Sequence, residues 1–239
     1  DSTLNMIAVS AMLGDHIAAG IVSGYLHMFG IGSLHTGYTA AVDQWMSRYG
    51  TLYSVYIIMR MAGRLAFPIY CFLMVEGFEH TASRYKYASR LLLFAVVSEI
   101  PFDLAFNGRL LEAGYQNVFF TLFFGFVMMA GISQADLGGM MGALPKQLFK
   151  FAVIVSCMAA AQFLRTDYGA IGVLCMAAVY LFRKKRLYQV IAGCVAFSWE
   201  LTAPFAFIPV WFYNGKRVWN NKYFFYLFYP VHLLLIYLV

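Results

Sequence analysis

The sequence predicts an all-α protein, a polytopic transmembrane bundle of about eight helices, within a range of eight to ten. Of its 239 residues, 62% are hydrophobic and only 12% are charged. A soluble domain averages about 45–50% apolar and about 25% charged residues. The apolar residues also form long continuous runs, whereas a membrane β-barrel would show short segments of alternating polarity. We therefore expect residues 1–239 to form a single membrane domain.

The first apolar run has the most informative pattern. Leu4–Gly24 is long enough, at about 1.5 Å per residue in a helix, to cross ~30 Å of hydrocarbon. The pair Asp15-His16 lies near its middle. An aspartate at the bilayer centre costs roughly 2.5–3.5 kcal/mol on insertion scales, so ionisable residues there usually serve a function. Imidazole is the better general base near neutral pH, which favours His16 for chemistry and leaves Asp15 to orient or pair.

Seven further apolar runs predict the remaining helices. The second run contains Arg60, Arg64 and Pro68, and it is either one kinked helix or two half-helices that meet near Gly63. The runs are, with approximate ends, Thr51–Glu79, Ala88–Phe106, Asn117–Ser133, Leu148–Leu164, Tyr168–Phe182, Leu187–Phe212 and Tyr223–Val239.

Six ionisable residues fall near the middle of these runs, and most of the prolines accompany them. Directed toward lipid, the six would cost on the order of 15–20 kcal/mol, so we expect them to face one another. Proline frees a backbone carbonyl, and broken helices are tolerated at membrane depth where they line a cavity. The sequence therefore predicts several proline-broken helices around a polar midplane cavity. The six residues are Asp15, His16, Arg64, Glu99, Glu200 and His232.

Arg60 and Arg64 are one helical turn apart and share a face of the second helix. They could clamp a carboxylate, a phosphate or a developing oxyanion, or simply balance the acidic residues of the other helices. We expect Asp15 to pair with one of these two arginines.

Basic residues are concentrated in the connections after the second, fourth and sixth helices. Cytoplasmic loops carry an excess of lysine and arginine, so these connections, and with them both termini, are expected to face the cytoplasm. The basic residues could act as topology determinants that contact anionic lipids, or as a mouth for a phosphate-rich donor such as coenzyme A. They are Arg84, Lys86, Arg90, Lys146, Lys150, Arg183, Lys184, Lys185 and Arg186.

Several function classes find no support in the sequence. There is no Walker A, GxGxxG or GxSxG motif, and none of the four cysteines has a metal-binding spacing, so no metal is expected. The basic residues flank helices and no soluble domain carries them, so a nucleic-acid partner is not expected.

Several long segments closely resemble the TraX family. They include LNMIAVSAMLGDHIAAGI, RMAGRLAFPIYCFLMVEGFEHTASRYKYASRLLLFAVVSEIPFDLAF and KYFFYLFYPVHLLLIYLV. The resemblance implies a membrane acyltransferase of the bacterial inner membrane, grouped with heparan-glucosaminide acetyltransferase-type enzymes. The chain departs from the family pattern at Asn5, where a lysine is expected. The positions that match functional residues of the family are Asp15, His16, Arg64, Glu76, Arg84, Glu99, Asp103, Tyr229 and His232.

The hypothesis that follows is transfer of an acetyl group from cytoplasmic acetyl-CoA to a hydroxyl or amine. The acceptor would be a small molecule, glycan or peptide in or across the membrane, with His16 as general base or acyl carrier. The predicted catalytic residues are His16, Asp15, Arg64, His232 and Glu99, and the predicted donor-binding residues are Arg84, Lys86, Arg90, Arg183 and Lys184.

Two other readings stay open on the sequence. A proton-coupled transporter of small molecules would use the same broken helices and midplane acids. A scaffold or assembly protein would need no chemistry at all. The sequence leaves the oligomeric state undecided, a homodimer included.

Overall fold

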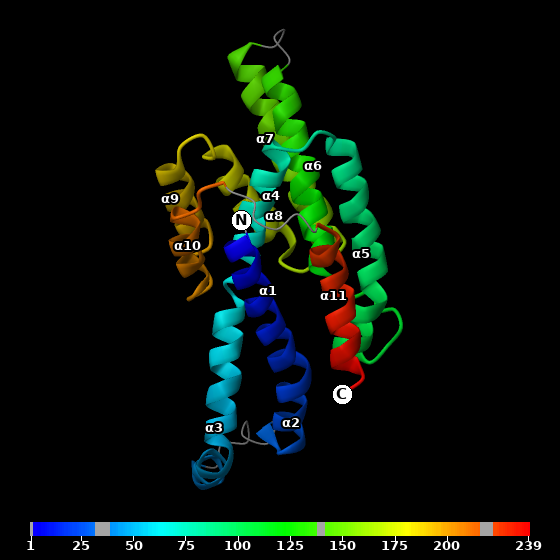
Figure 1. Cartoon of the computed structure of the whole chain (residues 1–239), viewed down its shortest axis with the longest axis vertical. Coiled ribbons are helices and arrows are strands. Elements are labelled where there is room, and N and C mark those ends of the chain that lie inside the picture. The colour runs from blue at the N-terminus through cyan, green and yellow to red at the C-terminus, as the bar shows by residue number, and fades with distance from the viewer. Residues whose placement is uncertain (1, 32–38, 138–141, 216–221) are drawn as a thin grey trace.

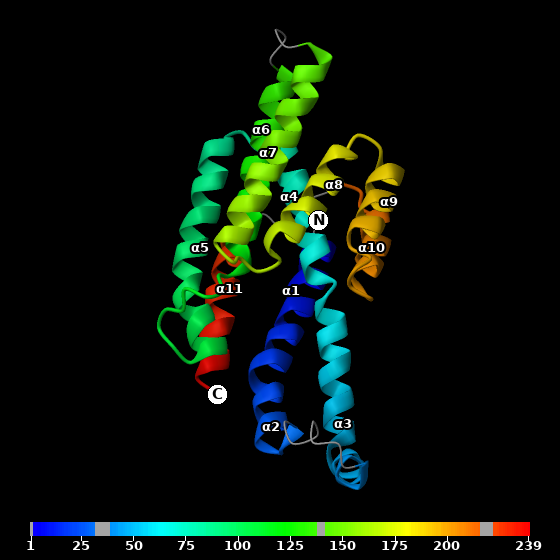
Figure 2. The ribbon, with the colours of Figure 1, turned by 180° about the vertical axis from the view of Figure 1, so that it is seen from behind.

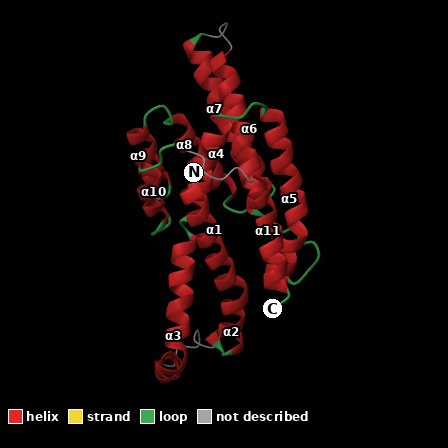
Figure 3. Ribbon diagram, in the orientation of Figure 1, coloured by secondary structure: helices red, strands yellow, loops and turns green. Residues whose placement is uncertain are grey.

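The computed structural model describes residues 2–31, 39–137, 142–215 and 222–239, which form an elongated bundle of helices (Figures 1 and 3). Within these ranges the pairing of Gln116 with Thr166 is an isolated β-bridge. An all-α membrane bundle is therefore confirmed. The helical rods that are long and apolar enough to cross a membrane are Thr3–Met28, Val42–Glu79, Val118–Leu137 and Ala143–Phe163, beside the shorter apolar helices Gly169–Leu181 and Tyr226–Tyr237.

The first rod carries the Asp15-His16 pair. It starts with α1 (Ser2–Ile17), continues through the π-helical turn η1 (Ala18–Val22) and ends with α2 (Ser23–Met28). A π-helical turn has a wider spacing than an α-helical turn and often occurs at functional sites. Here it begins directly after the turn that contains His16.

The second rod is interrupted where the sequence predicts a break. It consists of α3 (Thr39–Gly63) and α4 (Ala66–Glu79), separated by a turn at residues 64 and 65. Pro68 lies in the first turn of α4, and because proline has no N–H, the carbonyl of Arg64 loses its helical partner. The first rod packs along both halves, α3 and α4.

The other long helices bring the two ends of the sequence together. Helix α5 (Arg84–Asn107) is capped at its N-terminus by Ser83, whose Oγ accepts a hydrogen bond from Lys86 N at 3.3 Å. Helix α11 (Lys222–Tyr237) packs against α5 and also contacts α1 (Figures 1 and 2). Helices α6 (Val118–Leu137), α7 (Ala143–Phe163) and α8 (Gly169–Leu181) pack on one another, and α6 and α8 also contact α4.

The prediction of one helix across Leu187–Phe212 was wrong. The segment folds into α9 (Arg186–Ala196), the 3-10 turn η3 (Ala203–Ala206) and α10 (Phe207–Trp211). Eleven residues of α9 extend only about 16 Å, too short for a crossing. A Cβ on Gly193 would lie 2.1 Å from Cζ of Phe207, so α9 and α10 pack face to face. The prolines of η3 and α10 remove backbone donors and prevent one continuous helix.

The apolar core lies between α4, α6 and α8. Phe72, Phe78, Phe126 and Tyr180 are fully buried there. Helix α7 differs, since only 6% of its most apolar window is buried inside the protein. Such an apolar but exposed helix is expected to face lipid.

Candidate functional site

A pair of histidines, one buried and one half-buried, joins the first and last helices. Nδ1 of His16 on α1 lies 2.6 Å from Nε2 of His232 on α11. The two rings are parallel within 3°, with centroids 4.9 Å apart. His232 is only 3% exposed, and its Nδ1 lies 2.6 Å from the carbonyl oxygen of Phe228. The sequence prediction that these two histidines share a site agrees with this geometry.

The proton positions on the neutral pair follow from its partners. The carbonyl of Phe228 can only accept, so His232 carries its proton on Nδ1 and presents the lone pair of Nε2. His16 then donates Nδ1–H to that lone pair. The remaining nitrogen of His16, Nε2, has no hydrogen-bond partner among the described residues, so its lone pair is available. This arrangement holds one imidazole as an oriented base, and the second imidazole orients it.

Aromatic rings pack around His16. The edges of Phe106 and Tyr229 meet its ring, with centroids 5.5 and 5.8 Å away. Tyr229 is 3% exposed and also contacts the ring of His232. In such an environment polar interactions are stronger than in water, which suits a group that moves a proton.

Asp15 pairs with Arg60, one of the two alternatives left open by the sequence. Oδ2 of Asp15 lies 2.7 Å from Nη1 of Arg60. Helices α1 and α3 approach closely at this point. The absence of a side chain on Gly63 allows this, since a Cβ there would lie 2.3 Å from the Cβ of Asp15. The second oxygen, Oδ1, is buried and has no hydrogen-bond partner among the described residues. The ion pair therefore positions the turn of α1 that carries the histidine.

Arg64 belongs to a neighbouring group rather than to the histidine pair. Its Nη1 lies 3.1 Å from Oε1 of Glu200, in the loop between α9 and η3. Thr202 of the same loop donates to the carbonyl of Met61 at 2.6 Å. These contacts attach the short α9–α10 hairpin to the break in the second rod, and they oppose the prediction that Arg64 stabilises an oxyanion beside His16.

Glu99 caps a helix through one carboxylate oxygen, while its Oε1 is buried with no hydrogen-bond partner in the described part of the chain, and its catalytic role stays a prediction. Its Oε2 accepts hydrogen bonds from the backbone N–H of Asn117, at 3.2 Å, and from the side-chain amide of Asn117, directly before α6. The amide oxygen of Asn117 in turn accepts from Phe119 N at 3.0 Å. Asp103 serves the α5–α6 connection in a similar way, accepting from Glu112 N at 2.7 Å.

The α5–α6 and α7–α8 connections meet each other. Tyr115 donates to Oδ1 of Asp167 at 2.5 Å, and the hydroxyls of Thr121 and Thr166 are 2.9 Å apart. Burial raises the pKa of Asp167 to about 6, although the hydrogen bond from Tyr115 lowers it.

A cavity of about 510 Å³ reaches from a basic surface to within about one helical turn of the histidine pair. One end of this basic cavity is lined by His80, Lys86 and Arg90, near the α4–α5 connection. The other end is lined by Met12, one turn before His16 on α1, and by Tyr229 on α11. Along α4 the lining runs from residue 70 to residue 80, a depth of about 15 Å. The lining includes none of the six ionisable residues that the sequence places at the midplane, so this cavity, with its aromatic walls, differs from the predicted polar one.

The predicted basic residues divide into two groups. Lys86 and Arg90 line the basic cavity, and Nε of Arg90 is buried with no hydrogen-bond partner among the described residues. The other three are not among the lining residues. Arg84 stacks on Phe78 at 4.4 Å, Nε of Arg183 lies 2.8 Å from Oε1 of Glu79, and Lys184 is exposed.

Reasoning from the sequence missed most of the aromatic lining. Tyr70, Tyr213 and Tyr226 line the basic cavity beside Tyr229. Aromatic residues in apolar helices usually belong to the core, so no pattern distinguished these. Glu76, carried over from the resemblance, also lines the cavity, and Arg186 lies 3.7 Å from its carboxylate.

Fold and site together define a multi-pass helical membrane protein with an interior histidine pair at the end of a cavity with a basic mouth. The family model described as "TraX protein" matches residues 1–239, so the chain belongs to the TraX family. It is also 30% identical over 214 residues to the "Probable fimbrial assembly protein FimC, serogroup H1" of Dichelobacter nodosus. That alignment covers 76% of this chain and 82% of the relative. No solved structure matches the chain.

Proposed function

We propose that this protein is a membrane acyltransferase that moves an acetyl group from cytoplasmic acetyl-CoA to a hydroxyl or amine. The observation that carries the proposal is the basic cavity, since it leads from Lys86 and Arg90 to the turns before His16 and His232. Guanidinium and ammonium groups bind phosphates, so the mouth suits the nucleotide end of coenzyme A. The depth of about 15 Å along α4 suits an extended pantetheine arm that delivers the thioester to the histidines.

The proposed step uses the free nitrogen of His16. The acceptor oxygen or nitrogen attacks the thioester carbonyl, Nε2 of His16 takes the proton of the acceptor, and the carbon–sulfur bond breaks. The thiolate of coenzyme A leaves and receives that proton from His16, so the ring returns to its neutral form. His232 keeps the imidazole in one tautomer through its own bond to the carbonyl of Phe228. The same Nε2 lone pair would serve His16 as a general base or as an acyl carrier.

The relative's name links that protein to fimbrial assembly. We propose that the transferase activity of this chain serves a similar process at the bacterial surface, from the inner membrane. Small-molecule, glycan and peptide acceptors are all compatible with that setting.

The test is thiol release from acetyl-CoA by the protein in lipid nanodiscs. His16→Ala should lower the rate by about 10²–10⁴-fold, the usual contribution of a general base. Arg90→Gln should raise the KM for acetyl-CoA by about tenfold, because one charge-assisted contact contributes about 1.5–3 kcal/mol. Arg48→Gln, at an exposed residue of α3 that does not line the basic cavity, is the matched control and should behave as wild type.

Two results would contradict the proposal. Undiminished thiol release by His16→Ala would remove this residue from the chemistry. Proton-dependent uptake of a small molecule into vesicles, with no thiol release, would favour the transporter reading.

A further inference from the structure

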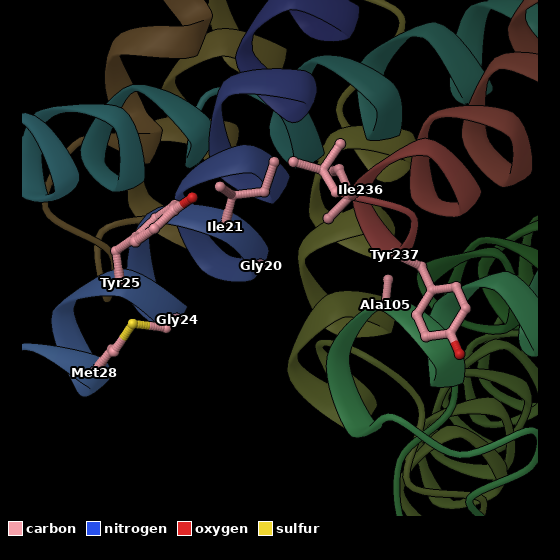
Figure 4. Close-up of a pocket in the computed structure, with 9 residues that line it drawn as sticks. Gly20, Ile21, Gly24, Tyr25, Met28, Ala105, Ile236 and Tyr237 are labelled. Carbon is pink, nitrogen blue, oxygen red and sulfur yellow. The ribbon is translucent and has the colours of Figure 1, made fainter.

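A second cavity lies on the other side of the histidine pair. It has a volume of about 280 Å³ and lies between the first rod, the end of α5 and the end of α11 (Figure 4). Gly20 follows His16 by four residues and Ile236 follows His232 by four, so this lining begins about 6 Å further along each helix. The basic cavity ends one turn before the same histidines, so the pair separates the two cavities.

The lining of this apolar cavity has no charged side chain. Figure 4 shows Ile21 and Ile236 facing each other across the gap, and Met28 adds a further apolar group. The polar side chains of the lining are Tyr25 and Tyr237, whose hydroxyls can donate and accept hydrogen bonds. An ammonium, carboxylate or phosphate would lose its hydration here without a charged partner, at a cost of several kcal/mol. The cavity therefore suits an uncharged ligand.

The apolar cavity opens outward at a level marked by aromatic residues. Tyr25 and Tyr237 are each about half exposed, and Met28 is 77% exposed. In the adjacent turns Trp45 donates to the carbonyl of Phe29 at 2.7 Å. Tyrosine and tryptophan are enriched at the membrane–water interface. A ligand would therefore enter from the lipid, near the level of the headgroups.

Two glycines of the first rod shape the apolar cavity. A Cβ on Gly20 would lie 2.6 Å from Cγ2 of Ile236, so this glycine allows η1 and α11 to touch between the cavity and the histidines. At Gly24, one turn further, a Cβ would have nothing within 4 Å. The space at Gly24 is therefore free for a ligand.

We propose that the apolar cavity binds the acyl acceptor, and that this acceptor is a neutral membrane lipid with a free hydroxyl group. The inference rests on the proposed transferase function and names the substrate class of the same site. Donor and acceptor then approach the histidine pair from opposite sides. The acceptor binds there without a charge to desolvate, and its chain lies against apolar side chains.

The test fills the apolar cavity by substitution. Gly24→Leu places a side chain in the free space without a clash. Gly14→Leu is the matched control, because a Cβ there also has nothing within 4 Å and Gly14 lines neither cavity. Both variants are placed in nanodiscs with a diazirine-bearing analogue of dodecanol, and labelled peptides are identified by mass spectrometry after illumination. Thiol release from acetyl-CoA is measured separately with dodecanol.

We expect labelling of residues 17–31 and 226–239 in the wild type and in Gly14→Leu, and dodecanol should increase their thiol release. In Gly24→Leu, the labelling of these segments and the dodecanol-dependent thiol release should each fall at least tenfold. Its affinity for coenzyme A should be unchanged. Equal labelling of the two variants, or labelling only elsewhere, would overturn the inference. If a hydrophobic peptide amine increases thiol release from acetyl-CoA and dodecanol does not, the assignment of a lipid acceptor is overturned. Specific labelling without thiol release for any acceptor would support the lipid site and refute the transferase.

Discussion

The close approach of α1 and α3 makes Gly63→Ala a sharp test of how His16 is positioned. The new Cβ would lie 2.3 Å from the Cβ of Asp15 and 2.5 Å from its Oδ1. Carbon atoms pack at about 3.5–4.0 Å, so the helices must separate by more than ~1 Å. Helix α1 would carry the adjacent histidine with it, and its hydrogen bond to α11 would lengthen.

Two opposing free energies act in this variant. Alanine favours a helix over glycine by about 1 kcal/mol, whereas overpacking costs about 1–3 kcal/mol. Gly14→Ala isolates the first effect, because its Cβ meets nothing within 4 Å. The helix term is common to both variants, so their difference should equal the overpacking cost of about 1–3 kcal/mol, which corresponds to ~2–12 °C in unfolding temperature for a chain of this size.

The assay is thermal unfolding in nanodiscs, followed by thiol release at a temperature where both variants are folded. We expect Gly63→Ala to unfold well below Gly14→Ala and to lose about 10²-fold in rate, as reported for displacements of ~1 Å at reacting groups. Equal unfolding temperatures would refute the close packing of α1 on α3. If Gly63→Ala loses the expected stability but keeps the wild-type rate of thiol release, this contact does not position the histidine.

Four further substitutions test other parts of the fold by thermal unfolding. Burial raises the pKa of Asp167 to about 6, so from pH 3.8 to 6 the folded state holds a proton that the unfolded state has lost, and stability falls as pH rises. The stability gain of Asp167→Asn, which can still accept from Tyr115, should therefore grow from pH 4 to 7 and then level off; a gain independent of pH would contradict this. Asn117→Ala should cost about 0.5–2 kcal/mol as a lost helix cap, whereas Glu99→Gln keeps an acceptor and should change little; a large loss of rate in Glu99→Gln at normal stability would instead place it in the chemistry. Gly193→Ala should lower the unfolding temperature by a few degrees through contact with the ring of α10, and unchanged stability would argue against the α9–α10 hairpin.

Most of the helices could be predicted because their signal is local. A long apolar run predicts a membrane helix whatever its neighbours are, and Pro68 predicts a break in the second rod because it lacks a backbone donor. Leu187–Phe212 misled this reasoning, since its length and composition allow a crossing. Whether such a segment crosses or turns back depends on packing, here on how closely Gly193 lets Phe207 approach.

The candidate site could be predicted only in part. His16 and His232 stand out because ionisable residues inside apolar runs are costly, and that cost does not depend on the partner. The same argument predicted that Arg64 and Glu99 also face the histidines. Instead, Arg64 pairs with Glu200, and Glu99 accepts hydrogen bonds from Asn117.

By itself, the sequence determined that this is an apolar helical protein of the TraX type, which carries a few scarce ionisable groups in its helices. Only the tertiary structure decided which of them meet. The 2.6 Å contact between His16 and His232 joins residues 216 positions apart, and the two cavities that end beside it have walls from several helices. Periodicity along a chain shows which face of a helix is polar, but the direction of that face is set by how whole helices pack against one another.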